Sequence, residues 1–317
     1  MPADGERVKG NGQPEARGLP TYPPRMAGTL ILCAGPIGNL ADAPPRLAEA
    51  LASADIVYAE DTRRARTLLE HLGVSVPTRS YFVGNESERS EEIADRLARG
   101  ETVALLTDAG TPGIADPGLS AVRAALGSGA TVTAVPGPSA VTLAVALSGL
   151  PADRFAFEGF LPRRGRERDE RIGRLAADER MVVLFAAPRR LAGDLGDLAR
   201  AHDRPRDCVV CREMTKLHEE IWRGTLEEAA AHWAEREAKG EVTVVLGPAP
   251  AAPPDVEAAL AAAEALVAEG VSPSRAVRRA ADEHGVSRRE LYERVIGPQP
   301  GPRPRRRQDP RGPSTPG

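Results

Sequence analysis

Short aliphatic runs alternate with longer segments of helical period over most of the chain, and this alternation limits the folds open to it. Four runs of the first part are predicted to be strands: Thr29–Cys33, Ile56–Ala59, Thr102–Thr107 and Thr131–Val135. The segments between them, rich in Ala, Leu, Arg and Glu, are predicted to be helices, and Gly73, Gly100 and Gly129 stand where these helices should end. The sequence therefore predicts an α/β fold.

The pattern changes after the turn Pro136-Gly137-Pro138. Further strands are predicted at Phe155–Phe157, Met181–Phe185, Cys208–Arg212 and Val242–Leu246, which gives a second α/β domain. Val256 to Val295 is predicted to form three short helices, the last two resembling a helix-turn-helix with Ser287 as a cap. We predict a disordered tail (1–26, with Met26 a possible true start), two α/β domains (27–136 and 137–248), a linker (249–254), a helix-turn-helix-like domain (255–297) and a disordered basic tail (298–317).

Composition narrows the class of protein further. No run of 18 or more apolar residues occurs, so no membrane span is expected, and three cysteines are too few for a disulfide framework, which favours a reducing cytoplasm. Cys208 and Cys211 form a C-x-x-C inside a strand-like run, where a structural role is favoured over redox or zinc chemistry. The net charge is -3, but arginines crowd residues 163–174 and the C-terminal tail, which indicates either a polyanionic partner or solvated surface.

Glycine- and proline-rich loops follow the predicted strands. The first strand leads into Gly35-Pro36-Ile37-Gly38-Asn39, the second into Glu60-Asp61-Thr62-Arg63, and the third into Asp108-Ala109-Gly110-Thr111-Pro112-Gly113. Ligands of open α/β sheets bind beyond the carboxyl ends of strands, so these loops are expected to share a rim that accepts a nucleoside. The loops lack the spacing of a dinucleotide or P-loop site, and each alone is as compatible with a structural turn.

Six motifs in a fixed order carry a family resemblance: G-P-I-G-N-L, A-E-D-T-R, D-A-G-T-P-G-I-A-D-P-G, P-G-P-S-A, E-G-F-L-P-R and R-E-M-T-K-L-H-E-E-I-W-R-G-T-L. In this order they resemble the ribosomal RNA small subunit methyltransferase I family, within the tetrapyrrole methylase superfamily. That family 2'-O-methylates a cytidine of 16S rRNA. The likeness spans Gly28 to about Leu246, and the C-terminal helices resemble the family's small helix-turn-helix domain.

The resemblance implies two α/β domains with S-adenosylmethionine in the cleft between them, a homodimer and no metal. Transferred residue by residue, it implies a donor pocket formed mostly by backbone contacts. The implied residues are Gly35, Pro36, Gly38, Asp108, Ala109, Gly110, Thr111, Pro112, Pro136, Gly137, Ser139, Glu158, Gly159 and Phe160.

A ribose hydroxyl must lose its proton as it attacks a methyl group, so a base or a charge-stabilising cation is expected. Lys216 is predicted to act there if its pKa is depressed by burial or by neighbouring cations, with Glu213 orienting it. The alternative is a surface ion pair between the two, and Asp61 and Glu60 are rival bases.

RNA contacts are predicted for eight residues of both α/β domains and the C-terminal helices: Arg63, Asn85, Arg189, Arg275, Arg278, Arg279, Arg288 and Arg289. Two other functions stay open at this point. A superfamily relative could methylate a tetrapyrrole or a modified histidine, and a chain without catalysis could act as an RNA-binding assembly factor.

Overall fold

The computed structural model describes residues 28–250 and 255–296. These residues fall into two compact units, with the boundary in the chain between Ala249 and Pro250, and each unit is described by itself. The predicted tails and most of the predicted linker lie outside the described residues.

The first sheet contains five parallel strands in the order β3-β2-β4-β1-β5. Its strands are β1 (Thr29–Cys33), β2 (Ile56–Ala59), β3 (Thr78–Ser80), β4 (Thr102–Leu106) and β5 (Thr131–Val135). Four of these were predicted within one residue, while the short, polar β3 was missed. Strand β1 lies between β4 and β5, so the loops after β1, β4 and β5 leave the sheet side by side.

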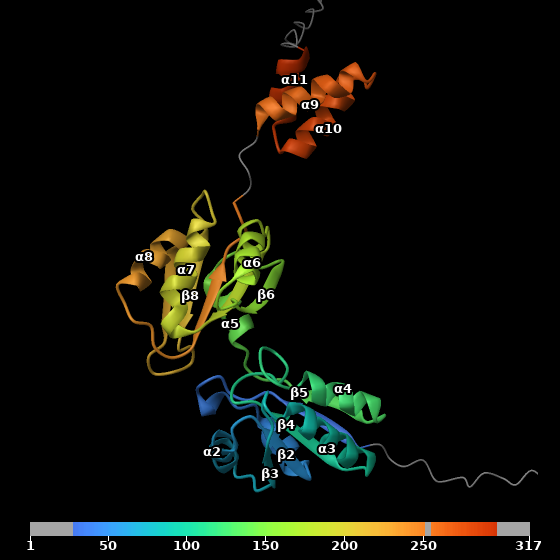
Figure 1. The fold of residues 1–317 in the computed structure, drawn as a ribbon, viewed down its shortest axis with the longest axis vertical. Coiled ribbons are helices and arrows are strands. Elements are labelled where there is room, and N and C mark those ends of the chain that lie inside the picture. Colours follow the sequence, from blue (N-terminus) through green and yellow to red (C-terminus); the bar gives the residue numbers. More distant parts are fainter. Residues whose placement is uncertain (1–27, 251–254, 297–317) are drawn as a thin grey trace, which may run out of the picture. The chain divides into compact units, whose positions relative to one another are not determined.

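Four helices cover this sheet: α1 (Pro45–Ser53), α2 (Thr62–Leu72), α3 (Glu86–Ala98) and α4 (Leu119–Gly127). Apolar side chains of α1 and α2 pack on one face, and those of α3 and α4 pack on the other. In Figure 1, α2 lies on one side of this sheet, and α3 and α4 lie together on the other. Helix α2 begins directly after β2 because Asp61 caps it, and it ends at Gly73 in the left-handed conformation. The caps therefore set where α2 starts, beside the carboxyl ends of β2 and β4.

The second sheet is mixed, with the order β6-β7-β10-β8-β9. Its strands are β6 (Phe155–Phe160), β7 (Met181–Ala186), β8 (Asp207–Arg212), β9 (Glu220–Thr225) and β10 (Val242–Leu246). Only β6 and β7 are parallel; β10 pairs antiparallel with both β7 and β8, and β8 pairs antiparallel with β9. Strand β9 was not predicted, and β6 extends three residues beyond its predicted end.

Helices cover both faces of the second sheet. Helix α5 (Ala140–Ser148) follows β5 of the first sheet and packs on one face. The opposite face is covered by α6 (Arg166–Ala176), α7 (Leu191–Arg200) and α8 (Leu226–Ala234). Cys208 and Cys211 belong to the cores on opposite faces, and burial raises the pKa of the Cys211 thiol to about 11. Their C-x-x-C is therefore a feature of core packing.

Residues 255–296 of the C-terminal unit form three helices, as predicted: α9 (Val256–Ala268), α10 (Pro273–His284) and α11 (Arg288–Ile296). Helix α10 ends at Gly285 in the left-handed conformation, and the Ser287 hydroxyl accepts a hydrogen bond from Glu290 N at 3.4 Å. A small core built largely of alanine joins the three helices. The fold class predicted from the sequence, two α/β domains and a helix-turn-helix-like domain, is confirmed.

Candidate active site

The loops after β1, β4 and β5 meet at the carboxyl edge of the first sheet. The amide of Gly35 donates to the carbonyl of Gly110 at 2.9 Å, which joins the loops after β1 and β4. Gly137 lies so close to the β1 loop that a Cβ on it would sit 2.8 Å from the Ala34 carbonyl oxygen. Only glycine fits this approach, which explains the small residues in these motifs.

A pocket of about 390 Å³, here called the cleft pocket, is lined by residues of both α/β domains. This volume is within the range of roughly 300–1,000 Å³ that is typical of small-molecule sites. The first domain and α5 contribute Ile37, Ala109, Gly110, Thr111, Ile114, Ala115, Asp116, Ser139, Ala140 and Val141. The second contributes Phe160, Phe185, Ala186, Ala187, Pro188, Gly240, Glu241, Val242 and Thr243.

The cleft pocket has the mixed lining that a nucleoside-bearing methyl donor requires. Phe160 and Phe185 contact each other with ring centroids 5.6 Å apart and give an apolar wall. Opposite them, the backbone at Gly110 takes a positive φ of 72°, and a Cβ there would point toward Ile37 at 3.8 Å. The residues therefore fit S-adenosylmethionine, which supplies a methyl group on a sulfonium when bound.

The predicted donor residues divide into three groups. Five line the cleft pocket: Ala109, Gly110, Thr111, Ser139 and Phe160. Six belong to the loops after β1, β4 and β5 but not to the lining of the cleft pocket: Gly35, Pro36, Gly38, Pro112, Pro136 and Gly137, of which Pro36 and Gly38 line a second pocket. The other three are Gly159, which has a positive φ of 62°, Glu158, which pairs with Arg171 at 2.7 Å, and Asp108, which also lines the second pocket.

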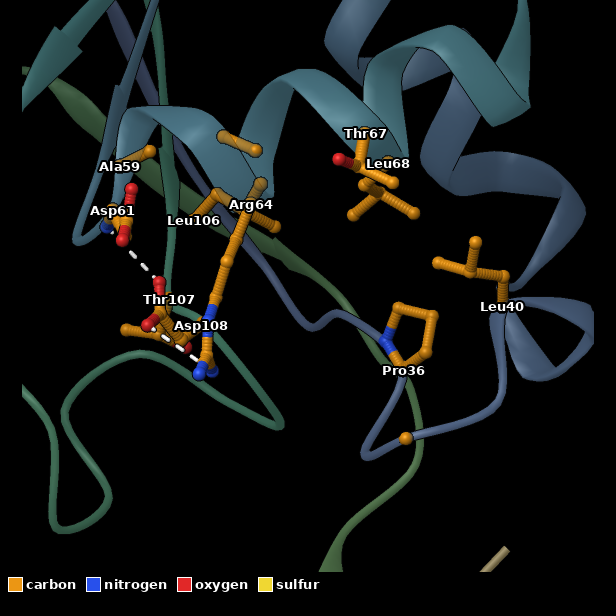
Figure 2. Close-up of a pocket in the computed structure, with 12 residues that line it drawn as sticks. Pro36, Leu40, Ala59, Asp61, Arg64, Thr67, Leu68, Leu106, Thr107 and Asp108 are labelled. Atoms are coloured by element: carbon orange, nitrogen blue, oxygen red, sulfur yellow. Dashed lines mark hydrogen bonds and ion pairs between the residues drawn. The ribbon is translucent and has the colours of Figure 1, made fainter. Parts of the chain in front are cut away.

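That second pocket, here called the α2 pocket, has a volume of about 280 Å³. It is lined by Pro36, Gly38, Leu40, Ala59, Asp61, Arg64, Ala65, Thr67, Leu68, Leu106, Thr107 and Asp108 (Figure 2). Asp108 Oδ1 accepts from the amide of Asp61 at 2.9 Å, and Asp108 Oδ2 lies 3.4 Å from Arg64 Nη1. These contacts tie the end of β4 to the start of α2.

The predicted pair of Lys216 and Glu213 is present, in a strained loop after β8. Glu213 and Thr215 both take positive φ values, 51° and 67°, which are unusual for residues with side chains. Lys216 Nζ donates to Glu213 Oε1 at 2.8 Å and to Glu241 Oε2 at 3.0 Å. Its aliphatic stem crosses Gly38, where a Cβ would lie 2.4 Å from Lys216 Cε. The loop thus holds a cation against the β1 loop.

Lys216 does not have the lowered pKa that a lysine base would need. Burial lowers its pKa, but the hydrogen bonds to Glu213 and Glu241 outweigh burial and raise it overall. Arg212, a cation at the end of β8, pairs with Glu220 at 3.0 Å. The expectation of a neutral lysine is therefore wrong for this arrangement, and the ion pair that was its alternative is what the structure contains.

Two of the acidic residues selected from the sequence, Asp61, a rival base, and Glu213, the partner of Lys216, have lowered pKa values. Hydrogen bonds from Arg63 hold the pKa of Asp61 well below its usual range. Burial alone would raise the pKa of Glu213, but hydrogen bonds from Lys216 and the Glu241 amide lower it overall. Weakly basic carboxylates of this kind are poor proton acceptors.

Asp116 has a raised pKa, in contrast to Asp61 and Glu213. It was not among the site residues selected from the sequence. Burial raises its pKa to about 6, and the nearby charges of Glu60, Asp108 and Glu241 add to the effect. Burial also raises the pKa of Glu60. The sequence signal for Asp116 was its place in Asp116-Pro117-Gly118, directly after the D-A-G-T-P-G loop. Thr243 lines the cleft pocket and was also missed, and its signal was that it is the only polar residue of the apolar run Val242–Leu246.

The predicted RNA-contacting residues have different surroundings. Arg63 pairs with Asp61, and the side chain of Asn85 is engaged by the backbone of Phe82 and Ser80, which disfavours an RNA contact for Asn85. Arg189 is exposed in a short 3-10 helix, Pro188–Arg190. On α11, Arg288 pairs with Asp282, and Arg289 pairs with Glu293.

Helix α10 carries an exposed basic strip. It consists of the α10 arginines: Arg275, Arg278 and Arg279. Their spacing of three and four residues places them on neighbouring turns of the helix, while the buried alanines of α10 face the core. Within residues 28–250 and 255–296, no carboxylate pairs with them. They are suited to contact phosphates.

Metal-binding clusters and membrane-spanning helices are both absent from residues 28–250 and 255–296. These residues contain no group of three or more His, Cys, Asp or Glu side chains arranged to hold a metal ion. In the same part of the chain, no helix is both long enough and apolar enough to cross a membrane.

Known proteins place this architecture in a family. The family model described as Tetrapyrrole (Corrin/Porphyrin) Methylases matches residues 29–230, and that described as RsmI C-terminal HTH domain matches residues 250–297. Cobalt precorrin-4 methyltransferase has a similar solved structure, with a TM-score of 0.54 and 19% identity, over 73% of this chain and 98% of that one. Uroporphyrin-III C-methyl transferase from Thermus thermophilus, complexed with S-adenyl homocysteine, gives a TM-score of 0.51 and 23% identity, over 69% and 97% of the two chains.

Fold and pocket together define a methyltransferase of the tetrapyrrole methylase class that uses S-adenosylmethionine. Ribosomal RNA small subunit methyltransferase I of Mycobacterium tuberculosis (strain CDC 1551 / Oshkosh) is 45% identical over 274 residues, which cover 85% of this chain and 95% of the relative. The protein of the same name from Synechocystis is 41% identical, over 84% and 96%. The chain belongs to the ribosomal RNA small subunit methyltransferase I family.

Proposed function

We propose that this protein transfers the methyl group of S-adenosylmethionine to the ribose 2'-oxygen of a cytidine in the decoding region of 16S rRNA. The proposal is carried by the 41–45% identity to small-subunit rRNA methyltransferases, which extends over most of both chains. The products are 2'-O-methylcytidine and S-adenosylhomocysteine. We further propose that the protein acts as a homodimer in the cytoplasm on the small ribosomal subunit.

The proposed reaction is a single displacement. The ribose oxygen attacks the methyl carbon, a new O–C bond forms, and the C–S bond breaks with its electron pair remaining on sulfur. The hydroxyl proton leaves as the oxygen attacks, and it needs an acceptor with a pKa near the working pH.

Asp116 is the acceptor that the site supports best. It lines the cleft pocket, and its pKa of about 6 leaves it ionised at neutral pH but more basic than an ordinary aspartate. Lys216, held as a cation across Gly38, positions the loop between the two pockets and offers a positive charge to the polyanionic substrate. Residues Ala109 to Thr111 of the loop after β4, together with Ser139 of the turn after β5, would hold S-adenosylmethionine.

The α10 arginines are proposed to dock the C-terminal domain on RNA phosphates. Arg288 and Arg289 on α11 and Arg189 of the second α/β domain are secondary candidates, since the first two already pair with acidic neighbours.

The experiment that tests the acceptor class offers radiolabelled S-adenosylmethionine together with three acceptors: 30S subunits lacking the modification, free 16S rRNA, and uroporphyrinogen III. Label in RNA, from subunits or from the free transcript, supports the proposal. Label in the tetrapyrrole alone would reassign the protein to the small-molecule enzymes of the superfamily. Donor binding is measured in parallel by calorimetry, and an absence of both binding and transfer would favour a non-catalytic assembly factor.

A further inference from the structure

The α2 pocket lies next to the cleft pocket, on the other side of the same two loops. Pro36 and Gly38 line the α2 pocket, whereas Ile37, between them, lines the cleft pocket. The second loop divides in the same way, because Thr107 and Asp108 face the α2 pocket while Ala109 faces the cleft pocket. A group held in one pocket is therefore separated from a group in the other by a wall one loop thick.

The α2 pocket has an apolar side and a polar side. Pro36, Leu40 and Leu68 lie on one side, and Arg64 reaches from α2 toward Asp108 on the other (Figure 2). The side chain of Arg64 is 64% exposed, and the 3.4 Å separation of its guanidinium from the carboxylate is longer than a good hydrogen bond. This pair can open to a ligand at little cost, in contrast to the tight pair of Arg63 and Asp61 at 2.6 Å.

We infer that the α2 pocket receives the flipped-out pyrimidine base of the acceptor nucleotide and that Arg64 and Asp108 select cytosine. The inference rests on the proposed function, since it assumes that RNA is the acceptor. Enzymes that modify a nucleotide commonly extrude it from the stack into a pocket with apolar walls, where polar groups read its Watson–Crick edge.

The polar pair matches cytosine and opposes uracil. A carboxylate accepts from the exocyclic amino group of cytosine, and a guanidinium donates to its N3 and O2 acceptors. Uracil presents a carbonyl to the carboxylate and an N–H at position 3 to the guanidinium, so these two contacts become repulsive and only the contact with O2 is kept. A purine is larger than a pyrimidine and would need more of the space in the α2 pocket, whose volume is about 280 Å³.

Asp108 is held in place for this role by its neighbours. Its Oδ1 is engaged by the amide of Asp61, and its own amide lies 3.4 Å from Glu60 Oε2, which leaves Oδ2 for a ligand or Arg64. Its position also explains why a residue of the D-A-G-T-P motif points away from the cleft pocket.

The first test fills the pocket. Thr67→Trp on α2 places an indole in the space for the base, and Glu70→Trp, on the same helix but outside the pocket lining, is the matched control. Thr67→Trp should lower kcat/KM for 30S subunits by about 10- to 100-fold, the size expected from excluding a stacked base. Affinity for S-adenosylmethionine should stay within about twofold for both variants, and Glu70→Trp should retain turnover.

The second test measures base choice as a ratio within each enzyme. Small subunits are reconstituted with 16S transcripts carrying cytosine or uracil at the nucleotide that the wild-type protein modifies. The wild-type protein should prefer cytosine by about 10-fold or more, and Arg64→Gln should lower that ratio by about threefold or more, since an amide can turn to match N3 of either base while Asp108 still selects at position 4.

The outcomes separate the two proposals. If the wild-type protein labels neither RNA, the proposed function fails. If RNA is labelled but Thr67→Trp equals its control, or the ratio is unchanged in Arg64→Gln, the base pocket is overturned and the proposed function stands.

Discussion

Replacing Asp116 by asparagine should make the protein more stable at neutral pH and much less active. The carboxyl group holds its proton more tightly in the folded protein, with a pKa raised from 3.8 to about 6 by burial and by the charges of Glu60, Asp108 and Glu241. A shift of about two pH units corresponds to roughly 3 kcal/mol, and since the group is only partly buried, about 1–2 kcal/mol is a realistic share.

The sign of the effect follows from proton linkage. Below about pH 4 the side chain is protonated in both the folded and the unfolded states, and its ionisation costs nothing. As pH rises from about 4 to 6, the unfolded state releases the proton while the folded state keeps it, so folding loses stability; above about 6 the folded state holds a poorly solvated anion and the loss is complete. Asparagine keeps the shape without the charge, so Asp116→Asn should raise the melting temperature by about 2–6 °C at pH 7.5. The difference should shrink toward zero as pH falls to 4.

The assay pairs thermal unfolding, followed by circular dichroism at a series of pH values, with turnover on 30S subunits. Wild-type turnover should rise through about pH 6, and the variant should lose about 100-fold or more in kcat together with this rise. A variant that is no more stable than wild type at pH 7.5, or that keeps the wild-type pH profile, would refute the assignment of Asp116.

Three further predictions concern the donor loops, the second domain and the RNA contact. Gly137→Ala places a methyl group 2.8 Å from the Ala34 carbonyl oxygen, so the affinity for S-adenosylmethionine, measured by calorimetry, should fall by about 10-fold or more. An affinity equal to that of the wild type would show that the loop can move to accept the methyl group. Arg206 is 1% exposed and donates hydrogen bonds to the carbonyls of Gly247 and Leu175. Arg206→Met should therefore lower the free energy of unfolding in urea by about 3 kcal/mol, and a loss below about 1 kcal/mol would contradict a structural role for these hydrogen bonds. Changing the three α10 arginines to glutamine should lower the slope of log affinity for rRNA against log salt by about 2–3, and an unchanged slope would exclude them from the contact.

Most of the core of the fold was predictable because buried strands carry an obvious signal. Every strand flanked on both sides in its sheet was predicted within a residue, since β1, β2, β4, β7, β8 and β10 are short runs of apolar residues. The missed strands, β3 and β9, are edge strands with the sequences TRS and EIWRGT. Edge strands are partly solvated and do not need an apolar pattern.

The donor loops could be predicted and the proton acceptor could not, for a physical reason. The turn and close-approach requirements at Gly110 and Gly137 act locally, so they appear as motifs. The pKa of Asp116 depends on Glu241, which is 125 positions away and is brought near only by the packing of the two domains. The pairing of Lys216 with Glu241 has the same origin, which is why the ion pair with Glu213 was foreseen and its second carboxylate was not.

The central claim is tested most directly by locating the methyl group on the product. Unmodified 30S subunits are incubated with the protein and S-adenosylmethionine, the 16S rRNA is digested to nucleosides and to oligonucleotides, and both are analysed by mass spectrometry. The account predicts one added methyl group on the ribose of a cytidine, as 2'-O-methylcytidine, within the decoding region. A methyl group on a base, or on the ribose of another nucleoside, would contradict it.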